Sequence, residues 1–411
     1  MTQKFLNRVV AEKLWRGLFF VLISCASQVT VRASCTDDTF AALNTLSNTI
    51  NADFANTFTV INALGACGAI PLIVQPDGST PAITASGYYC LTGDTTNTIT
   101  INSGVSDVTL DLNNHTITPR SGTDGIDVSS GCSRITIKNG TLSMLNSNGT
   151  SGVNLEGSSS DRDFHIYDVN INDGAQYGIH AVNGVTNLDI ARVIVTGSST
   201  GFYIIGASNV TMSECNASSD GQEGSGGFSI MGTLGSSVLL DSCIAAGSAG
   251  DGFDITGPNV TLTNCVAQGN GSITSTNAGF SISPGNNIML VNCTATFNIG
   301  VGFASTTVLG NVSSFISCIA QNNTGNGFDM SGSGGSGLIM SCVAEGNGVL
   351  LGLCGFNDQL SGSLYTYVAN SAEGNGINYC PSGAPYYPFT PNTTGNPNNF
   401  TPTYWNNMTL P

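Results

Sequence analysis

The feature that most constrains this chain is one phrase of sequence that recurs between Gly125 and Asn370. It is clearest from Gly252 to Ile255, where Gly-Phe-Asp-Ile is followed, after a polar gap, by Val-Thr-Leu-Thr at 260–263. Consecutive copies begin 23 to 28 residues apart, and they open at Gly125, Gly152, Gly178, Gly201, Gly227, Gly252, Gly279, Gly302, Gly327 and Gly355. A period of this length is typical of stacked repeat architectures, in which each unit packs only on its neighbours.

Each copy contains short runs in which apolar and polar residues alternate, the pattern of a strand with one buried face. In the run 260–263, for example, Val260 and Leu262 should face inward and the threonines outward. Glycine, asparagine and serine clusters between the runs supply turns. Three short strands per repeat predict an all-β fold, a right-handed parallel β-helix of about ten or more coils, with coils ~4.8 Å apart. We expect it to span residues 85–375.

Two residue types recur at fixed places in the repeat and predict interior columns. A phenylalanine directly follows seven of the opening glycines, and for six of these residues we expect one stack of rings, from Phe202, Phe228, Phe253, Phe280, Phe303 and Phe328. A cysteine follows an opening glycine by 13 to 16 residues in six coils, at Cys215, Cys243, Cys265, Cys293, Cys318 and Cys342. Coils ~4.8 Å apart suit a disulfide poorly, since its Cβ atoms lie ~3.8 Å apart. We therefore expect buried free thiols rather than a chain of disulfides.

The segments outside the repeats have their own signatures. Residues 1–33 read as a signal peptide, with a basic leader, a short apolar core and small residues before Ser34. Residues 22–25 also resemble a lipoprotein box, so a lipid anchor at Cys25 is an alternative to cleavage. The apolar run is too short to span a bilayer. These features predict a secreted or cell-surface protein, in the periplasm or on the outer surface if the source is bacterial.

Two further segments flank the repeats. Residues 35–66 carry an amphipathic helical stripe, which we interpret either as a cap on the open end of the β-helix or as a coiled-coil stalk that forms homo-oligomers through residues 37–64. Residues 376–411 form a tail rich in proline, asparagine and tyrosine, which should lie against the rod or a partner. Cysteines at the two ends suggest two disulfides, Cys67–Cys90 and Cys354–Cys380.

Charge excludes some partners. Residues 34–411 hold 25 of the 26 acidic residues and 5 of the 10 basic residues, a formal charge of −20. A surface this acidic repels phosphate, so we expect no nucleic acid partner. No lysine or arginine follows Arg192.

The phrase from Val108 to Ile117 resembles the first coil of exported bacterial right-handed β-helix proteins of the pectin-lyase-like superfamily, and the Gly-Phe-x-Ile phrases resemble their later coils. The resemblance covers residues 85–375. Many members act on carbohydrates, but the catalytic signatures are missing here. Residues 123–127 resemble part of a polygalacturonase motif, yet Gly122 replaces its asparagine and the remaining acidic, histidine and basic motifs are absent. We interpret Asp124 and Asp127 as turn residues.

One cluster of acid–base residues remains. Alignment of the repeats places His165 beside Asp189 in one outward column and Lys138 beside Tyr167 in the next, with Arg192 at the following turn. Such a set could abstract and donate protons on a uronic acid polymer, as in lyases and epimerases. The alternative is an ordinary solvated sheet face with cross-coil pairs, such as Arg192 with Asp168 or Glu214.

A second outward row follows each opening glycine and begins with Asp127, Asn154, His180 and Tyr203. The polar members could hydrogen-bond to a sugar chain, and Tyr203 could provide a stacking surface. The row continues through Ser229, Asp254, Ser281, Ala304, Asp329 and Asn357. The same composition also suits any soluble sheet face.

Three functions remain compatible with the sequence. The first is a non-catalytic exported rod that binds a glycan or another cell-surface ligand, which is the interpretation we favour. The second is a polysaccharide lyase or epimerase acting through His165 and Tyr167. The third is a structural spacer. We expect no metal and no cofactor.

Overall fold

The computed structural model describes residues 70–72, 74 and 82–381, apart from residues 145–149, 158–160, 173, 183, 219–225, 233–236, 273–276, 284–286, 306–311, 332–335 and 359–363. The chain divides into two units, residues 1–62 and 63–411, and every described residue belongs to the second. The predicted signal peptide, the predicted helix at 35–66 and residues 382–411 of the predicted tail lie outside the described part. Within that part, no helix is long and apolar enough to cross a membrane.

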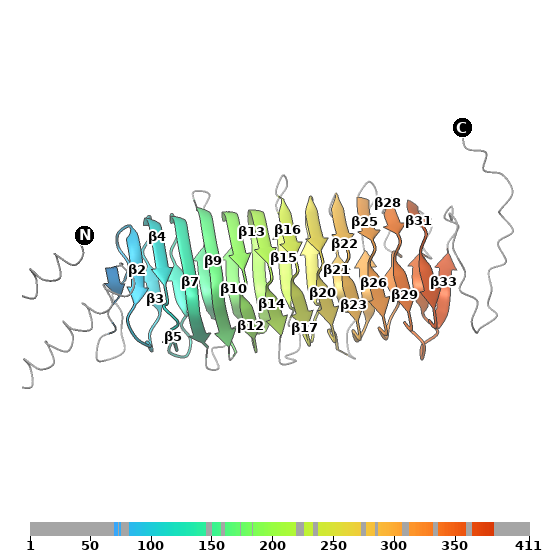
Figure 1. Ribbon diagram of the computed structural model, residues 1–411, viewed down its shortest axis with the longest axis horizontal. Helices are drawn as coiled ribbons and strands as arrows, with labels where there is room; N and C mark the ends of the chain where they lie inside the picture. Colours follow the sequence, from blue (N-terminus) through green and yellow to red (C-terminus); the bar gives the residue numbers. More distant parts are fainter. Residues whose placement is uncertain are drawn as a thin grey trace, which may run out of the picture. The chain divides into compact units, whose positions relative to one another are not determined.

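The described strands form the three faces of a coil that repeats along the molecule (Figure 1). We call these faces the first, second and third sheets, in the order in which the chain visits them after each opening glycine. The first sheet contains β3 (Ile99–Ile101), β6 (Ile126–Val128), β8 (Ser151–Glu156), β10 (Tyr177–Val182), the start of β13 (Thr200–Ser213), β15 (Phe228–Gly232), β18 (Phe253–Thr256), β21 (Ala278–Ile282), β24 (Val301–Ser305), β27 (Phe328–Asp329), β30 (Cys354–Asp358) and β33 (Ile377–Pro381).

The second sheet contains β1 (Ile70–Leu72), β2 (Gly87–Leu91), β4 (Ser106–Asp111), β11 (Thr186–Ala191), the end of β13, β16 (Val238–Asp241), β19 (Val260–Thr263), β22 (Ile288–Val291), β25 (Val312–Ile316), β28 (Ser336–Met340) and β31 (Leu364–Val368). The third sheet contains β5 (Thr116–Ile117), β12 (Ile194–Thr196), β14 (Asn216–Ser218), β17 (Ile244–Ala246), β20 (Val266–Gln268), β23 (Thr294–Thr296), β26 (Ile319–Gln321), β29 (Val343–Glu345) and β32 (Ser371–Glu373). Two long strands, β7 (Ser133–Ser143) and β9 (Arg162–Asn172), run through both the second and the third sheets.

Each strand pairs in parallel with the equivalent strand of the next coil. In the middle of the molecule β18 pairs with β21, β19 with β22, and β20 with β23, so one coil comprises three strands. The register keeps equivalent residues together: Phe253 pairs with Phe280 and Leu262 with Leu290. The predicted all-β parallel β-helix is therefore confirmed. Its strands extend from Ile70 to Pro381, beyond both ends of the range 85–375.

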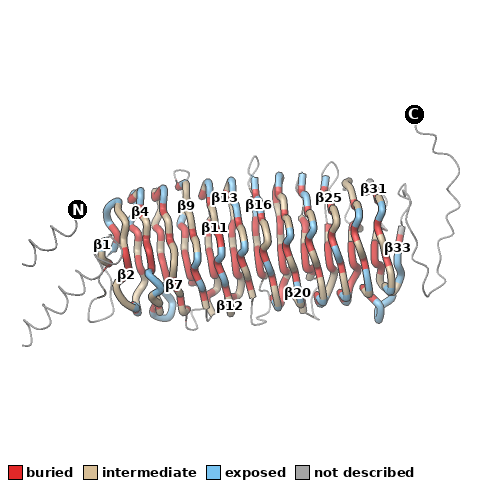
Figure 2. Tube along the Cα trace, viewed as in Figure 1, coloured by how far each residue is buried: buried red, intermediate tan, exposed pale blue. Residues whose placement is uncertain are grey.

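The phenylalanine column is confirmed and is longer than predicted. The six rings stack face to face inside the first sheet, with centroids 4.6 to 4.8 Å apart and interplanar angles of 4° to 7°. Phe356 adds a seventh ring at 4.8 Å from Phe328. All these rings are buried, and Figure 2 shows the buried stretches recurring coil after coil. A ring column of this kind fixes the register of each new coil on the one before it, because a slip by one residue would turn the ring outward.

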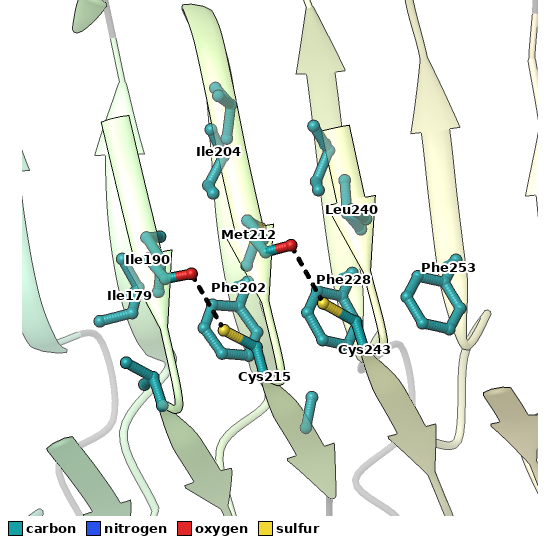
Figure 3. Close-up of a cluster of buried hydrophobic side chains, with 14 of the residues drawn as sticks. Ile179, Ile190, Phe202, Ile204, Met212, Cys215, Phe228, Leu240, Cys243 and Phe253 are labelled. Carbon is teal, nitrogen blue, oxygen red and sulfur yellow. Dashed lines mark hydrogen bonds between the residues drawn. The ribbon is translucent and has the colours of Figure 1, made fainter. Parts of the chain in front are cut away.

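The cysteine column lies beside the rings, and its members are free thiols, as expected. Figure 3 shows Cys215 directed at the carbonyl oxygen of Ile190 and Cys243 at that of Met212, each in the preceding coil. The Sγ-to-oxygen distances are 3.5 and 3.7 Å. Burial raises the pKa of the Cys342 thiol, which therefore stays protonated at neutral pH. Cys132, further toward the amino terminus, is also buried and free.

Small residues let the chain close each coil. A Cβ atom added at Gly252 would lie 2.6 Å from the carbonyl oxygen of Gly279, 2.7 Å from Nδ2 of Asn270 and 3.1 Å from Cβ of Ala267. The glycine is therefore needed for packing, because two backbones and an alanine meet there. Buried asparagines complete this corner: Asn270 bonds to Asn298, and Asn298 bonds to Asn323.

Disulfides occur at both ends of the coil stack. Cys354 and Cys380 are bonded to each other, as expected, and they join β30 to β33. Cys90 on β2 is also disulfide-bonded, and its predicted partner, Cys67, lies outside the described residues.

Candidate functional site

The second sheet places the predicted acid–base residues in the expected columns. His165 and Tyr167 lie two residues apart on β9, and Asp189 lies on the next strand, β11, paired with His165. Lys138 on β7 pairs with Tyr167. The chain then turns into the third sheet at a residue with positive φ, and this residue is Arg192 in the coil of Asp189, with φ 54°. The register predicted by counting from the glycines is therefore correct.

Three of the five predicted residues contact one another. The phenol of Tyr167 donates a hydrogen bond to Oδ2 of Asp189 at 2.6 Å. Nδ1 of His165 lies 2.7 Å from the same phenol oxygen and 3.4 Å from Oδ2 of Asp189. Because the phenol has one proton and gives it to the carboxylate, its oxygen accepts from a protonated Nδ1 of His165. The three side chains form a closed cross-coil network.

The electrostatics of this network oppose base catalysis by the tyrosine. Burial and the hydrogen bond to Asp189 raise the pKa of Tyr167 to about 12. A phenol with this pKa holds its proton at neutral pH, so Tyr167 cannot take a proton from a substrate carbon. Its only proton is already donated in the hydrogen bond to Asp189. The network therefore has the contacts of a structural cross-coil pair and lacks an ionised tyrosine base.

Lys138 belongs to a different cluster. Its Nζ lies 3.4 Å from Oδ2 of Asp111 on β4, and 5.2 Å from the ring centroid of Tyr88 on β2. The phenol of Tyr88 donates to the same oxygen of Asp111 at 2.6 Å, and Asn139 donates to Oδ1 at 3.1 Å. Lys138 thus contacts residues of the preceding coils, and its charge offsets that of Asp111.

Arg192 also has a partner of its own. Its Nε and Nη2 atoms donate to the two carboxylate oxygens of Asp168 at 2.6 and 3.0 Å. These hydrogen bonds lower the pKa of Asp168. The predicted pairing of Arg192 with Asp168 is confirmed. The structure therefore brings together His165, Tyr167 and Asp189, while the two predicted cations, Lys138 and Arg192, are each engaged with another carboxylate.

The first sheet carries the predicted ligand-binding row. Asp127, Asn154, His180 and Tyr203 lie on β6, β8, β10 and β13, one per coil and in register. Asp127 is therefore a strand residue, and its interpretation as a turn residue was wrong, because the strand begins one residue earlier, at Ile126. Asp124 lies before that strand, where its Oδ1 accepts from the backbone N–H of Ser151 at 2.6 Å.

The hydrogen bonds along this row are all donated toward the preceding coil, from His180 to Asn154 and from Asn154 to Asp127. Nδ1 of His180 donates to Oδ1 of Asn154 at 2.9 Å, and Nδ2 of Asn154 donates to Oδ1 of Asp127 at 3.1 Å. Burial lowers the pKa of His180, so the ring is neutral and its Nε2 atom is a hydrogen-bond acceptor. Burial raises the pKa of Asp127. These contacts fix the orientation of the amide and the imidazole before any ligand arrives.

An aromatic cluster adjoins the polar row. The ring of Tyr177 stacks on His180 with centroids 4.7 Å apart and on Tyr203 at 4.5 Å, and His180 and Tyr203 are 5.6 Å apart. All three rings are partly exposed. We call Tyr177, His180 and Tyr203 the aromatic platform. Tyr177 was not predicted from the sequence, because it lies three residues before His180 and so outside the row. A tyrosine at the start of a first-sheet strand was the available signal.

No metal site is evident near either cluster. In the part of the chain that the structure describes, no three or more His, Cys, Asp or Glu side chains are arranged to hold a metal ion.

Comparisons with known proteins give a family for part of the chain. Residues 151–313 match the family described as "Right handed beta helix region". No curated protein matches the sequence. Among solved structures, the A-module of a mannuronan C-5 epimerase from Azotobacter vinelandii aligns with a TM-score of 0.47 and 14% identity, over 81% of this chain and 95% of that one. Tailspike protein 3 of bacteriophage CBA120 aligns with a TM-score of 0.45 and 12% identity, over 80% of this chain and 57% of that one.

Pectate lyase Pel9A aligns with a TM-score of 0.32 and 14% identity, over 74% of this chain and 70% of that one. The matched region lies within the parallel coils described above, from β8 to β25. The family match and the coil geometry together identify the chain as a right-handed parallel β-helix protein, the fold that its resemblance to the pectin-lyase-like superfamily implied.

Proposed function

We propose that this β-helix is a non-catalytic glycan-binding rod whose ligand lies across the first sheet at the aromatic platform. The observation that carries the proposal is the combination of three partly exposed stacked rings with the directed polar row of Asp127, Asn154 and His180. We further propose that the rod is exported and displayed at a surface, as the sequence of residues 1–33 suggests.

The chemistry of the platform suits a sugar. One face of a pyranose ring presents C–H groups that pack on an aromatic ring, while its hydroxyl groups need donors and acceptors at the ring edge. Tyr177 and Tyr203 offer apolar ring surface and phenol groups. Nε2 of His180 offers an acceptor whose orientation is set by the hydrogen bond at Nδ1. Side chains already held in place cost less conformational entropy on binding.

Charge and proton chemistry disfavour the lyase alternative. Elimination from a uronic acid requires a cation near the carboxylate, a base for the C5 proton and an acid for the leaving oxygen. Lys138 and Arg192 are paired with Asp111 and Asp168, and Tyr167 keeps its proton, so it does not provide the base. The formal charge of −20 over residues 34–411 repels anionic polymers. These features favour neutral glycans as ligands.

The proposal is tested by binding of the purified protein to neutral oligomers of glucose, galactose and mannose, with oligomers of galacturonate and alginate as anionic comparisons. We expect saturable binding to at least one neutral series and at least tenfold weaker binding of Tyr203→Ala, a loss of about 1.4 kcal/mol. Phe297→Ala, which removes an exposed ring outside the first sheet, is the matched control and should bind like the wild type. Binding to no neutral series would favour the structural spacer, and equal binding by Tyr203→Ala would show that the glycan does not bind at the aromatic platform.

A further inference from the structure

The aromatic platform ends abruptly at Tyr203. Both ring partners of Tyr203, Tyr177 and His180, belong to β10 in the preceding coil. Among the described residues, no ring of the following coil contacts Tyr203. In that coil the residue in register with Tyr203 is Ser229 on β15, a short side chain that is partly exposed. The strand beside the last ring of the platform thus carries a short side chain at this position.

The spacing of the coils fits a sugar ring at this position. Neighbouring strands of a parallel sheet, which we call rungs, lie ~4.8 Å apart. This distance is close to the separation of two stacked rings. Inside the same sheet, the phenylalanine rings stack at 4.6 to 4.8 Å from coil to coil. A pyranose ring resting on Tyr203 would occupy the rung of Ser229 as the next ring of such a stack.

The rung beyond Ser229 supplies a carboxylate. Asp254 on β18 is in register with Ser229 and lies two rungs from Tyr203. Among the described residues of this row there are three aspartates, and two of them accept hydrogen bonds from amide side chains: Asp127 from Asn154, and Asp329 from Asn357 and Asn326. Burial raises the pKa of Asp254. In the described part of the chain, no hydrogen bond to its carboxylate is found.

A half-buried carboxylate without a donor has lost water contacts that nothing described here replaces. A hydroxyl group of a ligand would satisfy it with a charge-assisted hydrogen bond, which is stronger than one between neutral groups. The hydroxyl of Ser229, between Tyr203 and Asp254, can both donate and accept.

We propose that Tyr203, Ser229 and Asp254 form a subsite for one neutral pyranose unit, whose ring stacks on the free face of Tyr203 and whose hydroxyl donates to Asp254. The subsite rests on the proposed glycan-binding function and assigns it a sugar class. Asp254 accepts this hydrogen bond as a carboxylate, and Asp251 of the same coil adds a second nearby carboxylate. The two carboxylates repel a uronic acid unit here. The selected unit is a hexose with a free hydroxyl directed along the row.

The first test places a bulky side chain at the position of Ser229. Ser229→Trp places a bulky ring on the rung that the sugar would occupy, and we expect at least tenfold weaker binding to the neutral oligosaccharide series that the wild type binds. Ala304→Trp is the matched control, because Ala304 lies in the same row two coils beyond Asp254. It should retain wild-type affinity. Thermal unfolding of both variants shows whether each one remains folded.

The second test examines the carboxylate without changing its size. Asp254→Asn should weaken binding about tenfold, since a charge-assisted acceptor is replaced by a neutral amide. Ligands that each lack one hydroxyl group locate the contact: one of them should lose affinity for the wild type and lose much less for Asp254→Asn. Wild-type affinity in both Ser229→Trp and Asp254→Asn, together with loss in Tyr203→Ala, would overturn the subsite and leave the proposed function intact. Absence of neutral glycan binding by the wild type would overturn both.

Discussion

The phenol oxygen of Tyr167 lies 2.6 Å from Oδ2 of Asp189, and this hydrogen bond links β9 to β11 in the next coil. It has a measurable consequence at high pH, because the pKa of Tyr167 is raised to about 12. The neutral phenol is favoured in the folded state, so its contribution to stability is complete below about pH 10, the ordinary tyrosine pKa, and is lost as the pH rises toward 12. We expect the free energy of unfolding to fall over this range, and to fall less in Tyr167→Phe. Chemical unfolding of both proteins at a series of pH values measures this free energy. Identical slopes in the two proteins would contradict the assigned pKa.

The second prediction concerns catalysis. We expect no lyase activity on pectate or alginate, because the cations Lys138 and Arg192 are held by Asp111 and Asp168 and because Tyr167 keeps its proton and so does not provide the base. Ultraviolet absorbance of unsaturated sugar ends is the assay. If such ends appear and vanish in His165→Ala or Tyr167→Phe, the enzyme alternative replaces the binding one.

The third prediction concerns the thiols. The structure has seven buried free cysteines in its described part, which are Cys132 and the six of the column. An alkylating reagent should leave them unmodified in the native protein and modify all seven after denaturation without reductant, because burial denies the reagent access. Mass spectrometry counts the added groups. A peptide containing Cys243 linked to Cys265 would show that the column is oxidised.

The fourth prediction concerns the opening glycines. A methyl group at Gly252 would approach the carbonyl oxygen of Gly279 to 2.6 Å, and neither backbone can yield without disturbing two coils. Gly252→Ala should lower the free energy of unfolding by about 2–3 kcal/mol, the usual cost of overpacking. Gly93→Ala is the control, since nothing lies within 4 Å of its added Cβ. Equal stability of the two variants would show that the coils can spread apart at low cost.

The fifth prediction concerns Asp251, whose pKa burial raises to about 6. An acid with a raised folded-state pKa stabilises the fold at low pH, and this contribution is lost as the pH rises from about 4 to 6. At pH 7 the charged carboxylate therefore destabilises the folded state, and Asp251→Asn should stabilise the protein by about 1–3 kcal/mol. The amide oxygen can still accept from the N–H of Ala278, which bonds to Oδ1 at 2.5 Å.

Asp241 provides a control for this experiment, because its substitution should change the stability at pH 7 in the opposite direction. Hydrogen bonds, first from Thr263, lower the pKa of Asp241, so its contribution exists above the ordinary pKa and disappears in acid. Asp241→Asn should therefore reduce stability at pH 7 slightly, because the residue is only partly buried. Parallel pH profiles of Asp251→Asn and the wild type would show that Asp251 is not the titrating group.

The coil architecture was predictable because every repeat opens with a glycine, and six of the repeats add a phenylalanine and a cysteine at fixed places. Counting from Gly252 gives the rung of Phe253 and of Asp254 without knowledge of any contact. The pairing of Asp189 with His165 follows from the same count.

What the sequence could not supply is the direction in which a long side chain leans. Lys138 has Tyr167 on one neighbouring rung and Asp111 on the other, and both are in register with it. The structure shows that Asp111 and Tyr88 bind it, and Tyr88 precedes the recognisable repeats. Tyr177 was missed for a related reason: its ring leans onto His180 and Tyr203 from outside the row.

The pairing of each coil with its two neighbours makes the molecule behave as a one-dimensional zipper. In such an array an interior coil has two neighbours and a terminal coil has one, so opening starts at the ends and spreads inward. The disulfide between Cys354 and Cys380 joins the last two strands of the first sheet, and Cys90 is cross-linked near the opposite end. Covalent bonds therefore occur at the two places where unzipping would begin, and the reduced column of thiols lies in the interior, where neighbours on both sides already hold each coil.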